Sequence, residues 1–247
     1  MEKLVLYVTG NDGLSKNAFN VSTLSSIIAA SLGVKVIKHV SYDTNKRCSD
    51  AMFLEEMGIR VCKNIKEIED DFFNKGIAFV ESLPSSVTEH FCPLVAPIYE
   101  TARFVGTSQF NVAMAYLFEF RKQKYPKAMV AVSSDADYDE AGICSSTHIF
   151  ELNNEKIFNY TISPENYGMA IADKIALTGA TPLYNKNLAI DIFSKKIKGP
   201  KMDVLSINSA LMLHSAGFTD NIKKGIIMSY ESLETLNALN TLEILRG

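Results

Sequence analysis

Residues 3–23 read KLVLYVTGNDGLSKNAFNVST, and this order predicts a strand, a turn and the start of a helix. The apolar run from Lys3 to Val8 is typical of a buried strand, and it stops at the turn-forming residues Thr9 to Gly13. Asparagine, serine and threonine are good N-caps, so Asn20 to Thr23 predict a helix that continues to Gly33. Such a unit presents backbone N–H groups to an anion, although, for this loop taken alone, a plain strand-to-helix connection is the favoured explanation.

The alternation of strands and helices continues through the first half of the chain. A helix is expected from Ser49 to Met57, ending at Gly58. Further strands are expected at Val34 to Lys38, Ile59 to Cys62, Gly76 to Glu81 and Lys127 to Val132. Strands that alternate with helices of this length predict a parallel sheet with right-handed crossovers. The expected fold class is therefore α/β, with a mainly parallel sheet flanked by helices.

The second half of the chain has a different pattern. Two apolar segments around a short polar turn predict a hairpin, at Thr147 to Leu152 and Lys156 to Tyr160. Three helices are then expected, at Leu183 to Ile197, Asp203 to Ser215 and Thr219 to Leu239. Asn208 and His214, on the middle helix, are interpreted as satisfied core or rim residues. Residues 1–247 are expected to form one domain with a reduced helical part.

The composition limits the classes of function. Of 247 residues, 47% are hydrophobic and 21% are charged, which is ordinary for a globular chain and argues against disorder. The net charge of −3 gives no general attraction to nucleic acid or membrane, so neither partner is expected. Without a signal-peptide pattern or an apolar run of about 20 residues, the protein is expected to be cytoplasmic. The four cysteines lack metal-binding spacing and are expected to be reduced, mostly buried thiols: Cys48, Cys62, Cys92 and Cys144.

Two groups of polar residues follow predicted strands and are candidates for chemistry. The acidic segment Asp135 to Glu140 comes directly after the strand that ends at Val132. Carboxylates at the carboxyl end of a parallel strand face the crevice in which such sheets bind ligands, and a divalent cation would neutralise their repulsion. A solvated acidic turn is an equally good interpretation. The second group is Lys38-His39, for which a substrate contact and a structural role are both open.

In their order and spacing, these features resemble the anthranilate phosphoribosyltransferase family, whose fold is shared with pyrimidine nucleoside phosphorylases. The family's Gly-Thr-Gly-Gly-Asp loop, Asn-Ile-Ser-Thr helix start and Lys-His-Gly-Asn strand end are similar to Val8 to Asp12, Asn20 to Thr23 and Lys38 to Ser41. Its Leu-Glu-Ala-Leu-Gly, Asp-Gly-Leu-Asp-Glu, Pro-Glu-x-x-Gly and Asp-Ala-Val-x-x-Asn-Ala-Ala motifs resemble Leu54 to Gly58, Ala136 to Glu140, Pro164 to Gly168 and Asp203 to Ala210. The resemblance covers nearly the whole chain, from about Tyr7 onward.

The resemblance implies a Mg²⁺-dependent transferase. Such an enzyme moves ribosyl 5-phosphate from phosphoribosyl pyrophosphate (PRPP) to the nitrogen of anthranilate, in tryptophan biosynthesis, or of another aromatic amine. The resemblance assigns catalysis to Lys38 and His39. It assigns the binding of Mg²⁺ to Asp139, Glu140 and Ser22, because a cation neutralises charge on the leaving diphosphate. The substrate-binding residues that it implies are Thr9, Gly10, Asn11, Asp12, Asn20, Ser22, Thr23 and Lys38.

Several positions depart from the family's pattern. Val8 and Asn11 replace glycines of the phosphate loop, which obstructs a close backbone approach. Tyr99 and Glu100 stand where the family carries the arginines expected to meet anthranilate, and a Gly-Pro-Leu-Thr-Asn-Pro segment is missing after Gly106. The family's N-terminal helical domain, which provides much of its dimer contact, is also expected to be absent. Self-association, or a partner chain, is therefore expected to differ from the family dimer.

Two functions follow from this balance of matches and departures. The retained Asp139-Glu140 pair favours an active phosphoribosyltransferase that uses PRPP and a small aromatic acceptor. The lost arginines and glycines favour a catalytically lapsed relative that binds a nucleotide, a nucleic acid or a protein partner without turnover. The enzyme is slightly favoured.

Overall fold

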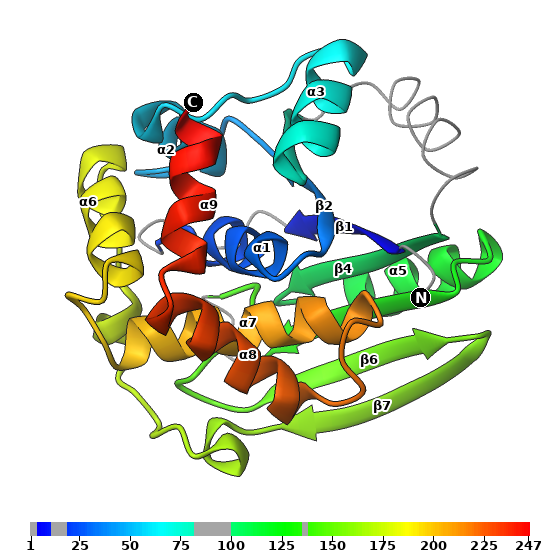
Figure 1. The fold of residues 1–247 in the computed structure, drawn as a ribbon. Coiled ribbons are helices and arrows are strands. Elements are labelled where there is room, and N and C mark those ends of the chain that lie inside the picture. Colours follow the sequence, from blue (N-terminus) through cyan, green and yellow to red (C-terminus); the bar gives the residue numbers. More distant parts are fainter. Residues whose placement is uncertain (1–3, 11–18, 82–99, 135–137) are drawn as a thin grey trace.

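The computed structural model describes residues 4–10, 19–81, 100–134 and 138–247 (Figure 1). Within them, seven strands form one sheet in the order β3-β2-β1-β4-β5-β6-β7. The strands are β1 (Leu4–Gly10), β2 (Lys35–Val40), β3 (Ile77–Glu81), β4 (Glu100–Thr107), β5 (Lys127–Ser133), β6 (Thr147–Asn153) and β7 (Lys156–Ile162). The helices are α1 (Val21–Ser31), α2 (Asp50–Met57), α3 (Ile65–Lys75), α5 (Phe110–Lys122), α6 (Pro182–Phe193), α7 (Pro200–Ser215), α8 (Ile222–Glu234) and α9 (Asn237–Arg246). Two short 3-10 helices are η1 (Pro164–Tyr167) and η2 (Lys174–Leu177).

The sheet is parallel from β3 to β5 and ends in the antiparallel hairpin β6–β7. β1 lies between β2, where Val5 is beside Lys35, and β4, where Val5 is beside Thr101. The chain runs from β1 outward to β2 and β3, and β4 then lies on the other side of β1. The carboxyl ends of β1 and β4 therefore flank a topological switch point, which is where open α/β sheets bind ligands. The expected fold class, α/β with a mainly parallel sheet flanked by helices, is confirmed.

Helix α1 is the central helix of the larger helical layer. Figure 1 shows α1, α7 and α8 lying over one face of the sheet. All residues from Val21 to Ala29 are buried, including two serines that are 0% exposed. Buried hydroxyls need hydrogen-bond partners. Ser25 accordingly donates to the carbonyl of Leu205 on α7 (3.1 Å), and Ser26 donates to the carbonyl of Ser22 within α1 (2.7 Å).

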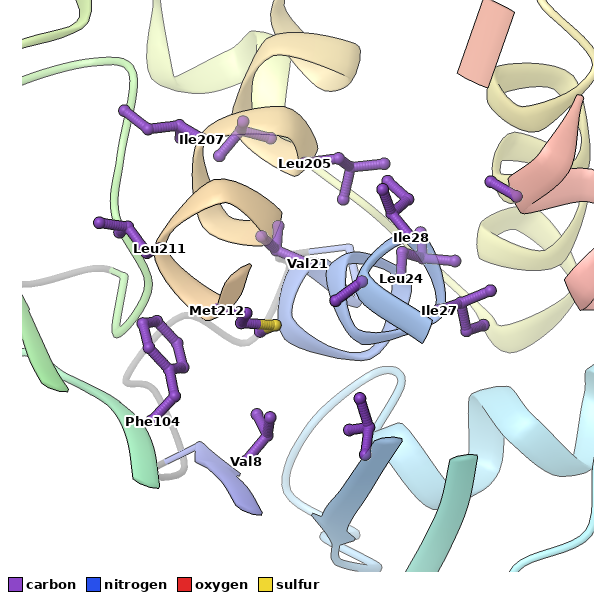
Figure 2. Packing of buried hydrophobic residues seen from close by; sticks show 14 of the residues in the cluster. Val8, Val21, Leu24, Ile27, Ile28, Phe104, Leu205, Ile207, Leu211 and Met212 are labelled. Atoms are coloured by element: carbon purple, nitrogen blue, oxygen red, sulfur yellow. The ribbon is translucent and has the colours of Figure 1, made fainter. Parts of the chain in front are cut away.

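The main core fills the space between α1, α7 and the sheet. Figure 2 shows Leu24 and Ile28 of α1 near Leu205 of α7, with Val8 and Phe104 of the sheet below them. All five side chains are at most 1% exposed. Burying an aliphatic or aromatic side chain contributes about 1.5–3 kcal/mol, so this contact is a main source of stability.

Two helices cover the opposite face of the sheet. Helix α3 packs Ile68 and Phe72 against the face formed by β1, β2 and β3. It begins at Asn64, whose side chain accepts the backbone N–H of Glu67 (3.1 Å), and it ends at Gly76 in the left-handed conformation. Helix α5 packs in the same way against β4, β5 and β6.

The structure adds β4, α3 and α5, which the sequence did not predict. The sequence of β4, ETARFVGT, interrupts its apolar residues with Arg103 and Gly106, so no apolar run marks it. It is nevertheless a strand because it pairs along its length with both β1 and β5. Pairing with two neighbours supplies hydrogen bonds that local sequence cannot indicate.

Two expected elements were wrong in extent. Ile59 to Cys62 forms no strand and makes a single bridge between Cys62 and Val80. The helix expected from Thr219 to Leu239 is two helices, because Leu236 adopts a left-handed conformation with φ of 64°. That turn ends α8 and lets α9 pack against α1.

Three of the cysteines are free thiols, as expected: Cys48, Cys62 and Cys144. The first two are buried, and burial raises the pKa of Cys48 to about 12. Cys92 lies outside the described residues.

In the part of the chain that the structure describes, no helix has the length and apolar character needed to cross a membrane.

An ion pair between His214 on α7 and Glu151 on β6 ties the helical layer to the hairpin. Nε2 of His214 lies 3.4 Å from Oε2 of Glu151, and its Nδ1 lies 3.1 Å from the carbonyl oxygen of Thr219. Tyr160 donates to the same carboxylate oxygen (3.0 Å). The hydrogen bond between the two side chains raises the pKa of His214 and lowers that of Glu151. The interpretation of His214 as a satisfied rim residue is confirmed.

This pair predicts a pH-dependent contribution to stability. The pKa of His214 is raised above 6.5, so its contribution is complete below 6.5 and is lost as the pH rises through the folded pKa. The pKa of Glu151 is lowered below 4.5, so its contribution is lost as the pH falls through the folded pKa. We expect His214→Gln to lower the free energy of unfolding by about 1 kcal/mol near pH 6, and by clearly less near pH 8.5.

Urea denaturation at both pH values measures this difference. His148→Gln is the matched control, because His148 is exposed and pairs with the hydroxyl of Thr161 instead of a carboxylate. An equal loss of stability in His214→Gln at both pH values would contradict the role of the ion pair.

Candidate active site

The candidate site lies at the carboxyl ends of four parallel strands. Val8 of β1 is beside Lys38 of β2, and Gly10 at the end of β1 is beside Gly106 near the end of β4. Strand β5 ends at Ser133, shortly before the acidic turn. Because parallel strands end at the same edge, residues from four distant segments meet around the switch point.

Lys38 points into the helical layer, and its side chain is 1% exposed. Its Nζ donates to Oδ2 of Asp50 (3.2 Å) and to the carbonyl oxygen of His39 (2.8 Å). Asp50 is the first residue of α2, a position where the helix dipole favours a negative charge. Burial alone would raise the pKa of Asp50, but the charge of Lys38 and the hydrogen bond from Asn20 outweigh it, and the pKa is lowered. Lys38 is therefore held in an internal ion pair.

Asn20 connects this ion pair to two helices. It precedes α1, but its side chain makes no capping bond to that helix. Its Nδ2 donates instead to Oδ1 of Asp50 (2.9 Å), and its Oδ1 accepts from Nδ2 of Asn185 on α6 (3.1 Å). Asn185 is 2% exposed and also accepts the backbone N–H of Ala180 (2.9 Å). A chain of hydrogen bonds thus links α6, α1, α2 and β2.

The acidic turn after β5 places Asp139 in a buried position, 3% exposed. Its Oδ1 accepts the backbone N–H of Ser108 (3.1 Å), whereas its Oδ2 has no hydrogen-bond partner among the described residues. Burial, and next the charge of Glu140, raise the pKa of Asp139 to about 7. Two neighbouring carboxylates in a buried site repel each other when both are ionised, and a bound cation relieves this repulsion.

Glu140 lies close to the Lys38–Asp50 pair and to α1. Its pKa is raised first by burial and then by the charge of Asp50, whereas Lys38 and hydrogen bonding with Ser22 lower it. Thr23, the next residue of α1, is fully buried, and its hydroxyl group helps to lower the pKa of Asp50, so it belongs to the polar surroundings of the Lys38–Asp50 pair.

Two residues fix the backbone of the acidic turn. Asn208 of α7 is fully buried and accepts the N–H of Ala141 (3.0 Å) while donating to its carbonyl (2.8 Å). Gly106 approaches the turn so closely that a Cβ there would lie 2.5 Å from the carbonyl oxygen of Asp139. The position of Glu140, between Asp139 and Ala141, therefore depends on α7 and on a glycine in β4.

His39 does not join this cluster. Adjacent residues of a strand point to opposite faces of the sheet, so His39 shares the α3 face with Ile37 and lies on the opposite face from Lys38. Burial, and then the charges of Arg103 and Lys38, lower the pKa of His39 to about 4. Arg103 itself lies over the ring of Tyr7, 4.4 Å from its centroid. Lys38 and His39, which the resemblance assigns together to catalysis, are thus separated by the sheet.

Glu100 also lies away from the site. The register places it beside Leu4, at the amino end of β4. A strand rises about 3.3 Å per residue, so the backbone at Glu100 is roughly 20 Å from that of Gly106 at the other end. The register therefore places the backbone of Glu100 at the opposite end of β4 from the candidate site. Tyr99 lies outside the described residues.

The structure brings together six of the residues expected at the site: Asn20, Ser22, Thr23, Lys38, Asp139 and Glu140. Thr9 and Gly10 end β1 at the same edge, whereas Asn11 and Asp12 lie outside the described residues. Asp50 and Asn185 were not recognised from the sequence. The sequence does contain a signal for Asp50, which is an acidic residue at a helix start, 12 residues after Lys38. Asn185 had none, because it is 165 residues from its partner Asn20.

The oxygen atoms at the site fit Mg²⁺. The described residues hold no group of three or more His, Cys, Asp or Glu side chains that could bind a metal ion. Mg²⁺ needs only one or two carboxylates, because waters and substrate phosphates complete its shell. Asp139, Glu140 and the hydroxyl of Ser22 offer such donors, and Oδ2 of Asp139 is an acceptor without a partner in the described segments.

The fold and this arrangement define a class of group-transfer enzymes. The family model described as "Glycosyl transferase family, a/b domain" matches residues 5–86 and 83–239, and the chain belongs to this family. Among its relatives, anthranilate phosphoribosyltransferase of Methanobrevibacter smithii is 28% identical over 256 residues, covering 97% of this chain and 76% of the relative. The enzyme of the same name from Staphylococcus haemolyticus is 27% identical over 259 residues, with the same two coverages.

Solved structures of the same kind share the fold. Anthranilate phosphoribosyltransferase from Thermus thermophilus has a TM-score of 0.82 and 22% identity, covering 98% of this chain and 77% of that one. The enzyme from Saccharomyces cerevisiae in complex with PRPP and Mg has a TM-score of 0.79 and 20% identity, covering 98% of this chain and 72% of that one. At these identities the likeness establishes the arrangement of the elements.

The hydrogen bonds of Asn208 predict a measurable effect on the acidic turn. Asn208→Ala leaves the N–H and carbonyl of Ala141 without these buried partners, so we expect a loss of about 2–3 kcal/mol in the free energy of unfolding. Ser209→Ala, one residue along the same helix, is the control, because its buried hydroxyl has no hydrogen-bond partner among the described residues. Denaturant titration of both variants tests this, and equal stabilities would contradict it.

Proposed function

We propose that this chain is a Mg²⁺-dependent phosphoribosyltransferase, which transfers ribosyl 5-phosphate from PRPP to the amino nitrogen of anthranilate or another aromatic amine. The observation that carries the proposal is the meeting of Asp139, Glu140 and Ser22 beside the Lys38–Asp50 pair at the switch point. The relatives named anthranilate phosphoribosyltransferase support the choice of reaction. The yeast structure with PRPP and Mg supports the choice of ligands.

The phosphate groups of PRPP would bind at the N-terminal end of α1. A helix N-terminus attracts anions through its free N–H groups and its dipole. Helix α1 has no acidic residue in its first turn, and the side chain of Asn20 makes no bond to the helix. Thr9 and Gly10, at the end of β1, would add backbone groups, and Thr23, in the first turn of α1, would add its hydroxyl.

Asp139, Glu140 and Ser22 would hold Mg²⁺, which when bound neutralises charge on the leaving diphosphate. The chain contributes by keeping these oxygens in place. Asn208 fixes the backbone after Glu140, and the N–H of Ser108 orients one oxygen of Asp139. The other oxygen of Asp139 is thereby left for a cation.

Catalysis in this proposal depends mainly on positioning. The nitrogen of an aromatic amine is uncharged at neutral pH and carries a lone pair, so alignment with the anomeric carbon of PRPP supplies most of the rate enhancement. His39 is not placed to assist, because it lies on the other face of the sheet. Its lowered pKa, about 4, is consistent with a neutral structural residue.

The acidic pair predicts that binding of PRPP depends on Mg²⁺. In wild-type protein, we expect calorimetric titration to show PRPP binding with Mg²⁺ and at least tenfold weaker binding without it. The double variant Asp139→Asn, Glu140→Gln should lose this metal dependence, because it lacks both anionic ligands. It should also lose the Mg²⁺-dependent consumption of anthranilate, followed by fluorescence, or of other aromatic amines in a panel.

The control for this experiment is Glu243→Gln, which removes an exposed carboxylate paired with Arg246 on α9. It should bind PRPP and respond to Mg²⁺ like the wild type. Circular dichroism and melting temperatures check that both variants are folded. PRPP binding by wild type that is independent of Mg²⁺, or no binding at millimolar PRPP, would refute the proposed function.

A further inference from the structure

The ion pair between Lys38 and Asp50 affects which ligands the site can bind. Lys38 is the only Lys or Arg side chain among the fully buried residues of the described segments. Nζ lies 3.2 Å from Oδ2 of Asp50, and the side chain of Asp50 is 22% exposed. The charge of Lys38 is therefore largely cancelled by Asp50 before any ligand arrives.

A second donor of the Lys38 ammonium group is also bound within the protein. One N–H of its ammonium group is taken by Asp50 and another by the carbonyl oxygen of His39, at 2.8 Å. Oδ1 of Asp50 is held by Asn20, which Asn185 holds in turn. Asp50 is therefore fixed from both sides, and the ion pair has a defined geometry.

The charge of Asp50 extends beyond its partner. It acts on Glu140 strongly enough to shift the pKa of that carboxyl group, so the two acids are close. The carboxyl groups of Asp50 and Glu140 both lie near the buried ammonium group of Lys38, whereas Asp139 lies near Glu140 and near a second cation, Lys46. The excess of negative charge around Lys38 repels a ligand with several negative charges, and each added charge on the ligand increases this repulsion.

We propose that Asp50 determines the affinity and charge specificity of this site, weakening the binding of polyanionic phosphate ligands by neutralising Lys38. The inference rests on the proposed function in that it places the phosphate ligand at the same site. Asp50 acts through Lys38 and through the electrostatic potential, and it need not touch the ligand. Its removal therefore strengthens binding, in contrast to the loss that follows when a ligand-contacting residue is removed.

The test is calorimetric titration of the 247-residue chain with inorganic pyrophosphate, at a fixed concentration of free Mg²⁺. Asp50→Asn keeps the shape of the side chain and an oxygen that can accept from Asn20, but it removes the charge. At an effective dielectric constant of about 20, one unit charge several ångströms away changes binding by about tenfold or more. We expect pyrophosphate to bind Asp50→Asn about tenfold more tightly than wild type. Inorganic phosphate, with fewer charges, should gain less.

Asp70→Asn is the matched control, because Asp70 also pairs with a cation, Arg60, but lies on α3 at the opposite face of the sheet. It removes the same charge from the protein and should leave the affinity for pyrophosphate unchanged within about twofold. A gain of less than threefold in Asp50→Asn, or the same gain in Asp70→Asn, would overturn the proposal.

A second variant decides the matter if Asp50→Asn does not fold, since a buried ammonium group without its partner is strongly destabilising. Lys38→Met combined with Asp50→Asn removes both charges and leaves the net charge unchanged. If Asp50 cancels Lys38, this double variant should bind pyrophosphate within about threefold of wild type. A larger loss would show that Lys38 attracts the ligand despite Asp50, and would refute the proposal.

The outcome is independent of catalysis. If Asp50→Asn binds pyrophosphate more tightly while wild type consumes no aromatic amine with PRPP, the inference holds and the proposed reaction fails. If wild type is an active transferase and Asp50→Asn shows no gain, the reaction stands and the inference fails.

Discussion

The burial of helix α1 is the constraint on which the rest of the structure depends. This helix packs against the sheet and against α7, which also contacts β4 and β5, and its residues from Val21 to Ala29 are buried. A helix so enclosed can shift only if the sheet and the neighbouring helices repack, because protein interiors are densely packed. Its N-terminal end is therefore fixed at the switch point, beside the ends of β1 and β2. The candidate site inherits that rigidity, since Asn20, Ser22 and Thr23 all lie at this end of the helix.

The second constraint is electrostatic. A buried ammonium group such as that of Lys38 requires a partner, and Asp50 provides it at the start of α2. Asn20 donates to the other oxygen of Asp50, and Asn185 donates to Asn20. Residues beside α1 and on α6 are therefore part of one polar network with the ion pair. On the other side, Asp139 and Glu140 have raised pKa values because the same space is both enclosed and already acidic. The site is thus rigid in shape and sensitive to the charge of whatever binds it.

Local sequence predicted those elements whose signals are local. The strand before Thr9, the helix start at Asn20 and the helix between Ser49 and Gly58 all carry an apolar run or a cap, and each is present. Strand β4 lacks such a signal, because Arg103 and Gly106 interrupt it, and it forms through pairing with β1 and β5. The break at Leu236 was equally hidden, because a leucine in a left-handed conformation is stabilised by the packing of α9 and not by its own preference.

The sequence by itself determined the α/β class, the mainly parallel sheet and most members of the candidate site, because strand ends, caps and acidic turns are encoded within a few residues. Only the tertiary structure decided which of these residues meet. It joined Asn20 to Asn185 across 165 positions, and it paired Lys38 with Asp50 inside the helical layer. It also placed His39 on the face of the sheet opposite to Lys38, and Glu100 at the end of β4 that is far from the candidate site. The physical reason is that strand direction, side-chain alternation and charge pairing act through space, and none of them is expressed in the order of neighbouring residues.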